Sequence, residues 1–320
     1  MRYGMTIPLP GVALHEHRDW LARLEQWGYT DLWTQETGGL DAFTPLAYAA
    51  AVCPTLRLGT GIAQIPTRGP ATLAMEAAAL TEAAPGRFVL GIGASSPAIV
   101  RDWNDLPFER PYSRTRDTLR FLRRALAGER IDERYETFAV RGFRLERPPA
   151  APPPIYVAAL RERMLDLAAS EADGALLGLV TADDVERIAP RVRAQSADLD
   201  VVLRLAVCPI DDAPRARAIG RRMLAAYLNV PTYARMHDGL GREELLKPLR
   251  EAWRAGDREA AERALPDDLV DGLFVHGSYG SCREQIARFV DAGVSTPLIG
   301  LFLPGVDLAE ALRGLAPAAS

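Results

Sequence analysis

One pattern repeats along the chain: a short apolar, often β-branched run, a turn, and then apolar residues at helical spacing. The unit occurs about eight times. The strands are predicted at 2–7, 30–35, 57–63, 88–93, 155–158, 174–177, 201–208 and 297–303. Helices are expected at 14–27, 45–52, 70–83, 113–127, 161–171, 181–196, 281–292 and 308–315, with two or more in 213–265. Strands that alternate with helices pair in parallel through right-handed crossovers.

Eight such units favour a closed TIM-type (β/α)8 barrel over an open, doubly wound sheet. No composition boundary divides the chain, so we expect a single domain over residues 1–320. Insertions are expected at about 97–113, 128–154 and 213–280. The second lacks helical spacing and is predicted to form a small hairpin or an irregular excursion. In such a barrel the active site lies at the carboxyl ends of the strands.

Composition narrows the class of protein. The net charge is −4 and the basic residues are scattered among acidic ones, which argues against a nucleic-acid groove. No apolar stretch reaches membrane-spanning length. The first residues lead directly into a strand and leave no room for a signal peptide, so we expect a cytoplasmic protein. Cys53, Cys208 and Cys282 are far apart and odd in number, which predicts reduced thiols without a disulfide framework.

Few ionisable groups follow the predicted strands. Glu36 is the only carboxylate directly after an early strand, and it is either a site residue or a salt-bridged residue of the rim. No Ser-His-Asp arrangement and no metal-ligand spacing occurs, so no metal is expected. The histidines are expected on the surface or in loops: His15, His17, His237 and His276.

A rim poor in acids and bases but rich in Gly, Ala and Ser suits a bound cofactor that carries the chemistry while the protein orients it. Small residues allow a flat ring to lie against the backbone. The start of the helix after the fifth strand, 160–164, offers free N–H groups for a phosphate. Arg161 and Arg163 either add charge there or are solvated first-turn residues.

Three ordered segments carry a resemblance to a known family: 57–70 (RLGTGIAQIPTRGP), 86–95 (GRFVLGIGAS) and 154–161 (PIYVAALR), the last followed by Ala172-Asp173-Gly174. They resemble the bacterial luciferase-like superfamily, and within it the class that uses the deazaflavin coenzyme F420. The resemblance implies a TIM-type barrel, a homodimer and a small-molecule substrate. It also implies a non-proline cis peptide bond at Gly61–Ile62, against which the ring would lie.

The same resemblance implies which residues contact the cofactor. They are Glu36, Gly61, Ile62, Gln64, Ala94, Ser95, Ala159, Leu160, Arg161, Arg163 and Met164. Several relatives have Gly-Gly where Leu160 and Arg161 stand, which implies a narrower pocket here. FMN shares the ring and the ribityl phosphate with F420 and is the alternative cofactor.

One departure from the family bears on the reaction. Sugar-phosphate dehydrogenases of this class use a His after strand two and a Glu after strand four, where this chain has Thr37 and Ser96. Neither is a good general base, so reduction of a substrate fits better than alcohol oxidation. Glu36, Thr37 and Ser96 are the catalytic candidates, without an assigned role.

Three functions follow as hypotheses. The first is an F420-dependent oxidoreductase that transfers hydride between C5 of the deazaflavin and a small organic substrate. The second is an FMN-dependent monooxygenase, with the insertions as lids. The third is a non-catalytic barrel relative. Side chains of the insertions are candidates for an apolar substrate pocket: Trp103, Phe108, Tyr112, Tyr227, Tyr233 and Met236.

Overall fold

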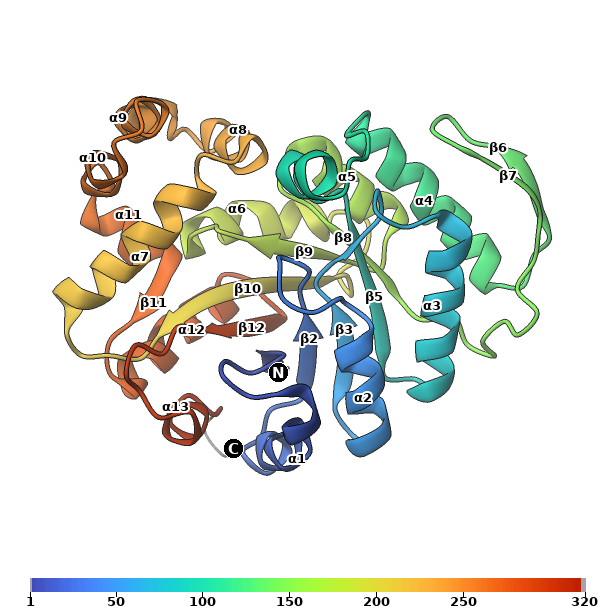
Figure 1. Ribbon diagram of the computed structural model, residues 1–320, viewed down its shortest axis with the longest axis horizontal. Coiled ribbons are helices and arrows are strands. Elements are labelled where there is room, and N and C mark those ends of the chain that lie inside the picture. Colours follow the sequence, from blue (N-terminus) through green and yellow to red (C-terminus); the bar gives the residue numbers. More distant parts are fainter. Residues whose placement is uncertain (1, 318–320) are drawn as a thin grey trace.

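A closed barrel of eight parallel strands lies at the centre of the protein, surrounded by helices (Figure 1). The computed structural model describes residues 2–317. Around the barrel the order is β1 (Gly4–Thr6), β2 (Asp31–Thr34), β3 (Arg57–Thr60), β5 (Phe88–Gly93), β8 (Ile155–Ala158), β9 (Gly174–Gly178), β10 (Asp200–Cys208) and β12 (Thr296–Leu301). β12 pairs with β1, which closes the ring. The predicted fold class is confirmed.

The helices cover the outer face of the barrel in chain order. They are α1 (His17–Gln26), preceded by a 3-10 turn at Leu14–Glu16, α2 (Thr44–Val52), α3 (Pro70–Ala83), α4 (Pro111–Leu126), α5 (Glu162–Glu171), α6 (Ala182–Val192), α12 (Tyr279–Asp291) and α13 (Leu308–Gly314). Apolar side chains at helical spacing, such as Leu21 and Leu24 of α1, are fully buried in one continuous core. This burial drives the helices onto the sheet.

The third predicted strand, 57–63, is divided in two. β3 ends at Thr60, and a separate short strand, β4 (Ala63–Gln64), pairs with β5. The peptide bond between Gly61 and Ile62 is cis, as the resemblance implied. A second cis bond joins Ile7 to Pro8.

Two insertions lie beside α4. A π-helical turn spans Ala98–Trp103, within the first insertion. The second forms the predicted hairpin, β6 (Ile131–Arg134) and β7 (Ala139–Phe143), at the right edge of Figure 1. Phe121 of α4 contacts the rings of Phe138 and Phe143 at centroid distances of 6.1 and 5.8 Å, so an aromatic cluster holds the hairpin against the helix.

The third insertion is mostly helical and lies at the upper left of Figure 1. It contains α7 (Ala213–Tyr227), α8 (Pro231–Gly239), α9 (Glu243–Arg254), α10 (Arg258–Arg263), α11 (Asp267–Leu273) and β11 (Phe274–His276). Its helices share a second hydrophobic cluster with the end of β10. β11 was not expected; it pairs with the end of β10, where Cys208 lies opposite His276.

The histidines correct one prediction. His15 is exposed, as expected, but His17 and His237 are buried in α1 and α8. His17 is held inside because its Nε2 accepts a hydrogen bond from the Leu9 amide at 2.8 Å. His276 ends β11 and lies 2.8 Å from Asp271 through its Nε2. His17 thus packs in the interior with both ring nitrogens paired, whereas Nε2 of the buried His237 has no partner. Residue type alone did not indicate that either histidine is buried.

Three further expectations concern metals, thiols and membranes. Cys53, Cys208 and Cys282 are buried free thiols, as predicted. Within residues 2–317, no group of three or more His, Cys, Asp or Glu side chains could hold a metal ion. None of the helices in this range is long and apolar enough to cross a membrane.

Candidate functional site

Three layers of side chains fill the inside of the barrel, and the lowest is polar. Arg57 of β3 is its centre: it donates to Asp31, to Asp200 Oδ2 at 3.1 Å and to Thr296 Oγ1 at 3.1 Å. Tyr156 also donates to Asp200. Burial alone would raise the pKa of the Asp200 carboxyl, but the Tyr156 hydroxyl and the Arg57 guanidinium lower it overall. These paired charges close the amino-terminal end of the barrel.

The middle layer is apolar. Side chains from alternate positions of the strands meet there, because successive residues of a strand point to opposite faces. The members are Trp33, Val89, Tyr156, Leu176, Val202 and Leu298. Trp33 is fully buried and supplies the largest side chain of this layer. The barrel is therefore a packed core below its mouth.

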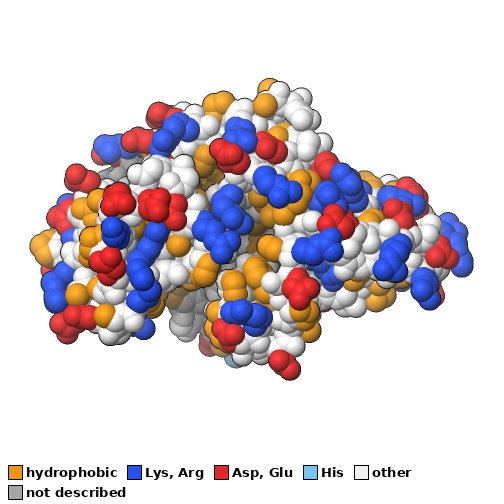
Figure 2. All heavy atoms as spheres, turned by 90° about the horizontal axis from the view of Figure 1, so that it is seen from above, with side chains coloured by type: hydrophobic (Ala, Val, Ile, Leu, Met, Phe, Trp, Pro, Cys, Tyr) orange, Lys and Arg blue, Asp and Glu red, His pale blue; other side chains and the backbone are white. Residues whose placement is uncertain are grey.

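The upper layer consists mostly of residues with little or no side chain. Two residues after a member of the apolar layer, toward the carboxyl ends, lie Ala158, Gly178, Arg204 and Gly300. Gly93 lies beside Ala158, and the register of β1 with β12 places Thr6 level with Gly300. A β-carbon added to Gly178 would meet nothing within 4 Å. The carboxyl ends thus enclose an open mouth. In Figure 2 the face seen from above is hollowed near its middle, with hydrophobic side chains inside and Lys or Arg side chains at the rim.

The cis peptide forms one wall of this mouth. Gly93 of β5 lies so near to it that an added β-carbon would be 2.7 Å from Ile62 Cδ1 and 2.9 Å from the Ala158 β-carbon. Ile62 and Ala158 both pack on the apolar layer below. Absence of a side chain at Gly93 therefore keeps the surface beside Gly61–Ile62 flat.

Glu36 is held by an arginine that the sequence reading did not connect with it. Arg68 Nη1 donates to Glu36 Oε2 at 2.8 Å, and the backbone N–H of Gln64 donates to the same oxygen at 3.2 Å. Gln64 Nε2 donates to the Glu36 carbonyl oxygen at 2.6 Å. Glu36 is thus salt-bridged, and the ion pair ties the segment after β2 to the segment after β3. Its role as a site residue stays a prediction.

The segment after β5 carries a strained residue. The backbone of Ser95 has a φ of 64°, in the left-handed region that residues other than glycine rarely adopt. Its Oγ is buried and has no hydrogen-bond partner. Ala94 and Ser96 are partly buried beside it, and Ser96 Oγ accepts from the Ile99 amide at 3.4 Å at the start of the π-helical turn. Thr37, in contrast, is exposed.

The start of α5 faces the same rim. Arg161 is the N-cap residue with an extended backbone, and no side chain caps the first amides of the helix. Arg161 and Arg163 are exposed, Leu160 and Met164 are partly buried, and Ala159 is buried. The Arg163 guanidinium lies 4.1 Å from the centre of the Tyr112 ring, a cation–π contact that joins α5 to the start of α4.

The aromatic candidates of the insertions do not form one pocket. Trp103 is 61% exposed, and Met236 is buried in the main core. Phe108 lines a cavity of about 340 Å³ that also touches Ala94 and Arg114. Tyr227 of α7 and Tyr233 of α8 make an edge contact, with ring centres 5.9 Å apart.

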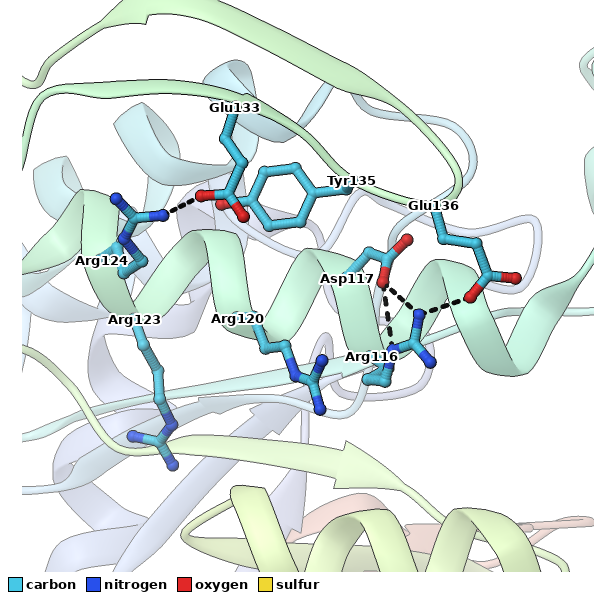
Figure 3. Close-up of a pocket in the computed structure, with 8 residues that line it drawn as sticks. All are labelled: Arg116, Asp117, Arg120, Arg123, Arg124, Glu133, Tyr135 and Glu136. Carbon is cyan, nitrogen blue, oxygen red and sulfur yellow. Dashed lines mark hydrogen bonds and ion pairs between the residues drawn. The ribbon is translucent and has the colours of Figure 1, made fainter.

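A larger cavity, of about 480 Å³, lies away from the mouth, between α4 and the hairpin (Figure 3). Four arginines of α4 line it, together with Asp117, Glu133, Tyr135 and Glu136. Arg116 bridges Asp117 and Glu136, whereas Arg120 pairs with Glu171 of α5. Because these charges are already neutralised by partners and the cavity does not open at the strand ends, we do not assign it a catalytic role.

Comparison with known proteins agrees with this geometry. The sequence matches the family described as luciferase-like monooxygenase over residues 1–296. The chain belongs to the luciferase-like monooxygenase family. It is 28% identical to a putative coenzyme F420-dependent oxidoreductase of Mycobacterium tuberculosis, over 93% of this chain and 94% of the relative. It is 26% identical to the 5,10-methylenetetrahydromethanopterin reductase of Archaeoglobus fulgidus, over 94% of this chain and 93% of the relative.

Solved structures show the luciferase-like fold. The coenzyme F420 dependent tetrahydromethanopterin reductase of Methanopyrus kandleri superposes with a TM-score of 0.80 at 20% identity, covering 98% of this chain and 97% of that chain. A Baeyer-Villiger monooxygenase component from Pseudomonas putida, solved in complex with FMN, gives a TM-score of 0.63 at 17% identity, covering 99% and 96%. At these identities the likeness concerns the fold alone.

Proposed function

We propose that this luciferase-like protein is a coenzyme F420-dependent oxidoreductase acting on a small organic substrate, as a reductase rather than as an alcohol dehydrogenase. The observation that carries the proposal is the glycine-lined mouth beside the cis peptide Gly61–Ile62. The relative of Mycobacterium tuberculosis that is named for F420 aligns over 93% of this chain and supports the choice of cofactor.

The residues present fit a flat tricyclic ring. Gly93 leaves the wall at Ile62 and Ala158 free of a projecting side chain, and Gly178 leaves the opposite side open. The buried Ser95 hydroxyl, which has no partner within the protein, is available to a ring heteroatom. When bound, the deazaflavin supplies hydride at C5. The chain's own part is to place the ring and the substrate against each other and to exclude water.

Glu36 and Gln64 then act as positioning residues. Their mutual hydrogen bonds and the Arg68 ion pair fix the backbone beside the cis peptide. We propose that Ala94, Ser95 and Ala159 contact the ring edge. The amides at the start of α5, from Leu160 to Arg163, with the side chains of Arg161 and Arg163, would hold the phosphate of the cofactor tail, since a helix N-terminus favours an anion. Met164 would contact the tail through its side chain, because its amide donates to the Arg161 carbonyl oxygen.

The direction of hydride transfer follows from the scarcity of bases. Alcohol oxidation needs a group that accepts the hydroxyl proton, and among the proposed site residues the carboxylate of Glu36 is engaged by Arg68. Ser96 and Thr37 are weak acids and weaker bases. Reduction requires only a proton donor, for which water or the Ser96 hydroxyl suffices. Ser96→Ala is therefore expected to lower the rate by less than about tenfold.

Cofactor titration tests the proposal. The purified protein is titrated with F420 and with FMN, and binding is followed by ligand absorbance and fluorescence. We expect micromolar affinity for F420 and at least tenfold weaker binding of FMN. Gly178→Leu should weaken F420 binding at least tenfold because it fills the mouth, whereas Gly39→Ala, at an exposed position with open space around it, should not. Micromolar binding of FMN but not F420 would reject the proposal.

The family description and the FMN-bound relative favour one alternative, an FMN-dependent monooxygenase. Its distinguishing signal is substrate-dependent oxygen consumption in the presence of reduced FMN. Failure of both cofactors to bind would instead favour a non-catalytic barrel relative. We also propose a homodimer, which light scattering after size-exclusion chromatography tests directly.

A further inference from the structure

Arg204 is a cation inside the barrel mouth without a partner. It lies on β10, two positions above Val202 of the apolar layer, and its side chain is partly buried. Its guanidinium lies over Gly300 of β12, where an added β-carbon would be 3.0 Å from Nη2. Its Nε is buried and unpaired, and within residues 2–317 no carboxylate reaches the guanidinium.

The lack of a partner for Arg204 contrasts with Arg57, the other arginine described inside this barrel. Arg57, in the lowest layer, meets two carboxylates and two hydroxyls. The carboxylate on β10 itself, Asp200, belongs to that lower network. Buried arginines in proteins are normally paired, because an uncompensated charge is costly to remove from water. A bound anion would therefore compensate the unpaired charge of Arg204.

Within residues 2–317, the ionisable neighbours of Arg204 are tyrosines and not carboxylates. The nearby ionisable groups that affect it are Tyr227 and Tyr233, from α7 and α8 of the third insertion. On the other side of Gly300, β1 presents Thr6, whose Oγ1 is also buried and unpaired. A guanidinium cannot lose its proton at neutral pH and offers only donors, while hydroxyls can donate as well. Such a set of donors around an open space selects an anionic oxygen group.

We propose that Arg204 binds an anionic oxygen group, carboxylate or phosphate, on the substrate of this enzyme. The identification of the bound molecule as substrate rests on the proposed function. β10 and β3 stand on opposite sides of the closed ring, so Arg204 faces Gly61–Ile62 across the mouth. A substrate held at Arg204 by its anionic end directs its other end toward the wall that we assign to the cofactor ring.

Binding of simple anions to the protein without cofactor tests this site. Benzoate, acetate and inorganic phosphate are titrated at constant ionic strength, with heat release and intrinsic tyrosine fluorescence as readouts. The variant is Arg204→Met, and the matched control is Arg235→Met, at an exposed position of α8. Circular dichroism and thermal unfolding establish that both variants fold.

We expect wild-type protein to bind one anion class at millimolar concentration or below. Arg204→Met should bind this anion at least tenfold more weakly. Arg204→Lys should retain part of the affinity, because the lysine ammonium supplies a point charge but no planar pair of donors. Arg235→Met should match wild type within twofold. The preference for carboxylates or phosphate identifies the group. Equal binding by wild type and Arg204→Met, or no binding by wild type, would overturn the proposal.

A parallel F420 titration separates this inference from the proposed function. If Arg204→Met binds F420 as wild type does while losing the anion, Arg204 belongs to the substrate side. If the variant loses F420 and keeps the anion, the assignment is wrong. Should wild type bind the anion but no F420, the anion site stands and the proposed cofactor fails.

Discussion

The Trp33 indole lies directly against the backbone of Gly59 on the neighbouring strand β3, in space that any side chain at Gly59 would occupy. A β-carbon there would overlap three atoms of the ring. Trp33 is fully buried and cannot move outward without displacing the rest of the apolar layer. The apolar layer thus accommodates its largest side chain, Trp33, because the residue paired with it, Gly59, has no side chain.

Gly59→Ala is therefore expected to destabilise the fold by about 3 kcal/mol or more, through overpacking. Denaturant unfolding followed by tryptophan fluorescence measures the loss. Gly39→Ala, which meets nothing within 4 Å, is the matched control and should change stability by less than about 0.5 kcal/mol. Equal stabilities of the two variants would contradict the packing described for Trp33.

Arg57→Met should be the most damaging change in the lower layer. It leaves Asp31, which is fully buried, without its main partner, and removes the cation beside Asp200. Breaking a buried pair from one side costs about 3–5 kcal/mol. The double variant Arg57→Met with Asp31→Asn should recover part of the loss, since it removes the orphaned charge. Absence of such recovery in urea unfolding would count against the charge argument.

The buried His237 is expected to make the stability of the fold sensitive to acid. Burial, reinforced by the nearby Arg242, lowers the pKa of His237 to about 4. The unfolded chain, with an ordinary histidine pKa of about 6.5, takes up the proton first as pH falls. Stability should therefore decrease by about 3 kcal/mol as pH falls from about 6.5 to 4, and this contribution should be constant above pH 7.

The measurement compares urea unfolding at several pH values for wild type, His237→Gln and His15→Gln. His237→Gln should show a flatter profile between pH 4 and 6.5. His15 is exposed, so its replacement should leave the profile as in wild type. Parallel profiles for all three proteins would mean that His237 is not the group that titrates.

Arg204→Met is expected to stabilise the ligand-free protein by about 1 kcal/mol, because it removes an unpaired charge from partly buried surroundings. Burial lowers the pKa of Arg204, which reflects the same cost. Thermal unfolding of the variant and of Arg235→Met measures the difference. A loss of more than about 1 kcal/mol would show that Arg204 has a structural role within the protein.

Much of the barrel was predictable because its strands are buried on both faces and read as short apolar runs between turn residues. The hairpin within 128–154 was also recognisable. β11 was missed because Phe274–His276 is only three residues long and follows a helix without a turn signal. The break after Thr60 was not visible as a strand end, although the resemblance had located the cis bond itself.

The candidate site was harder to predict from the sequence, because its main contacts join residues that are far apart along the chain. Arg68 follows Glu36 by 32 residues, and no local pattern indicates their ion pair. Arg204 was not predicted as a site residue because it lies inside a strand, whereas the site of a barrel is expected after the strand ends. Only the pairing of β10 with β9 shows that Arg204 lies beside Gly178, where an added β-carbon would meet nothing within 4 Å.

The separate hydrophobic cluster of the third insertion has an evolutionary consequence. Leu224, Leu246, Leu249 and Val270 are buried against one another rather than in the main core. Substitutions among these helices therefore affect the packing of the barrel only where the cluster meets the end of β10. A lineage, or a protein engineer, can therefore vary this block while most of the barrel is inherited unchanged.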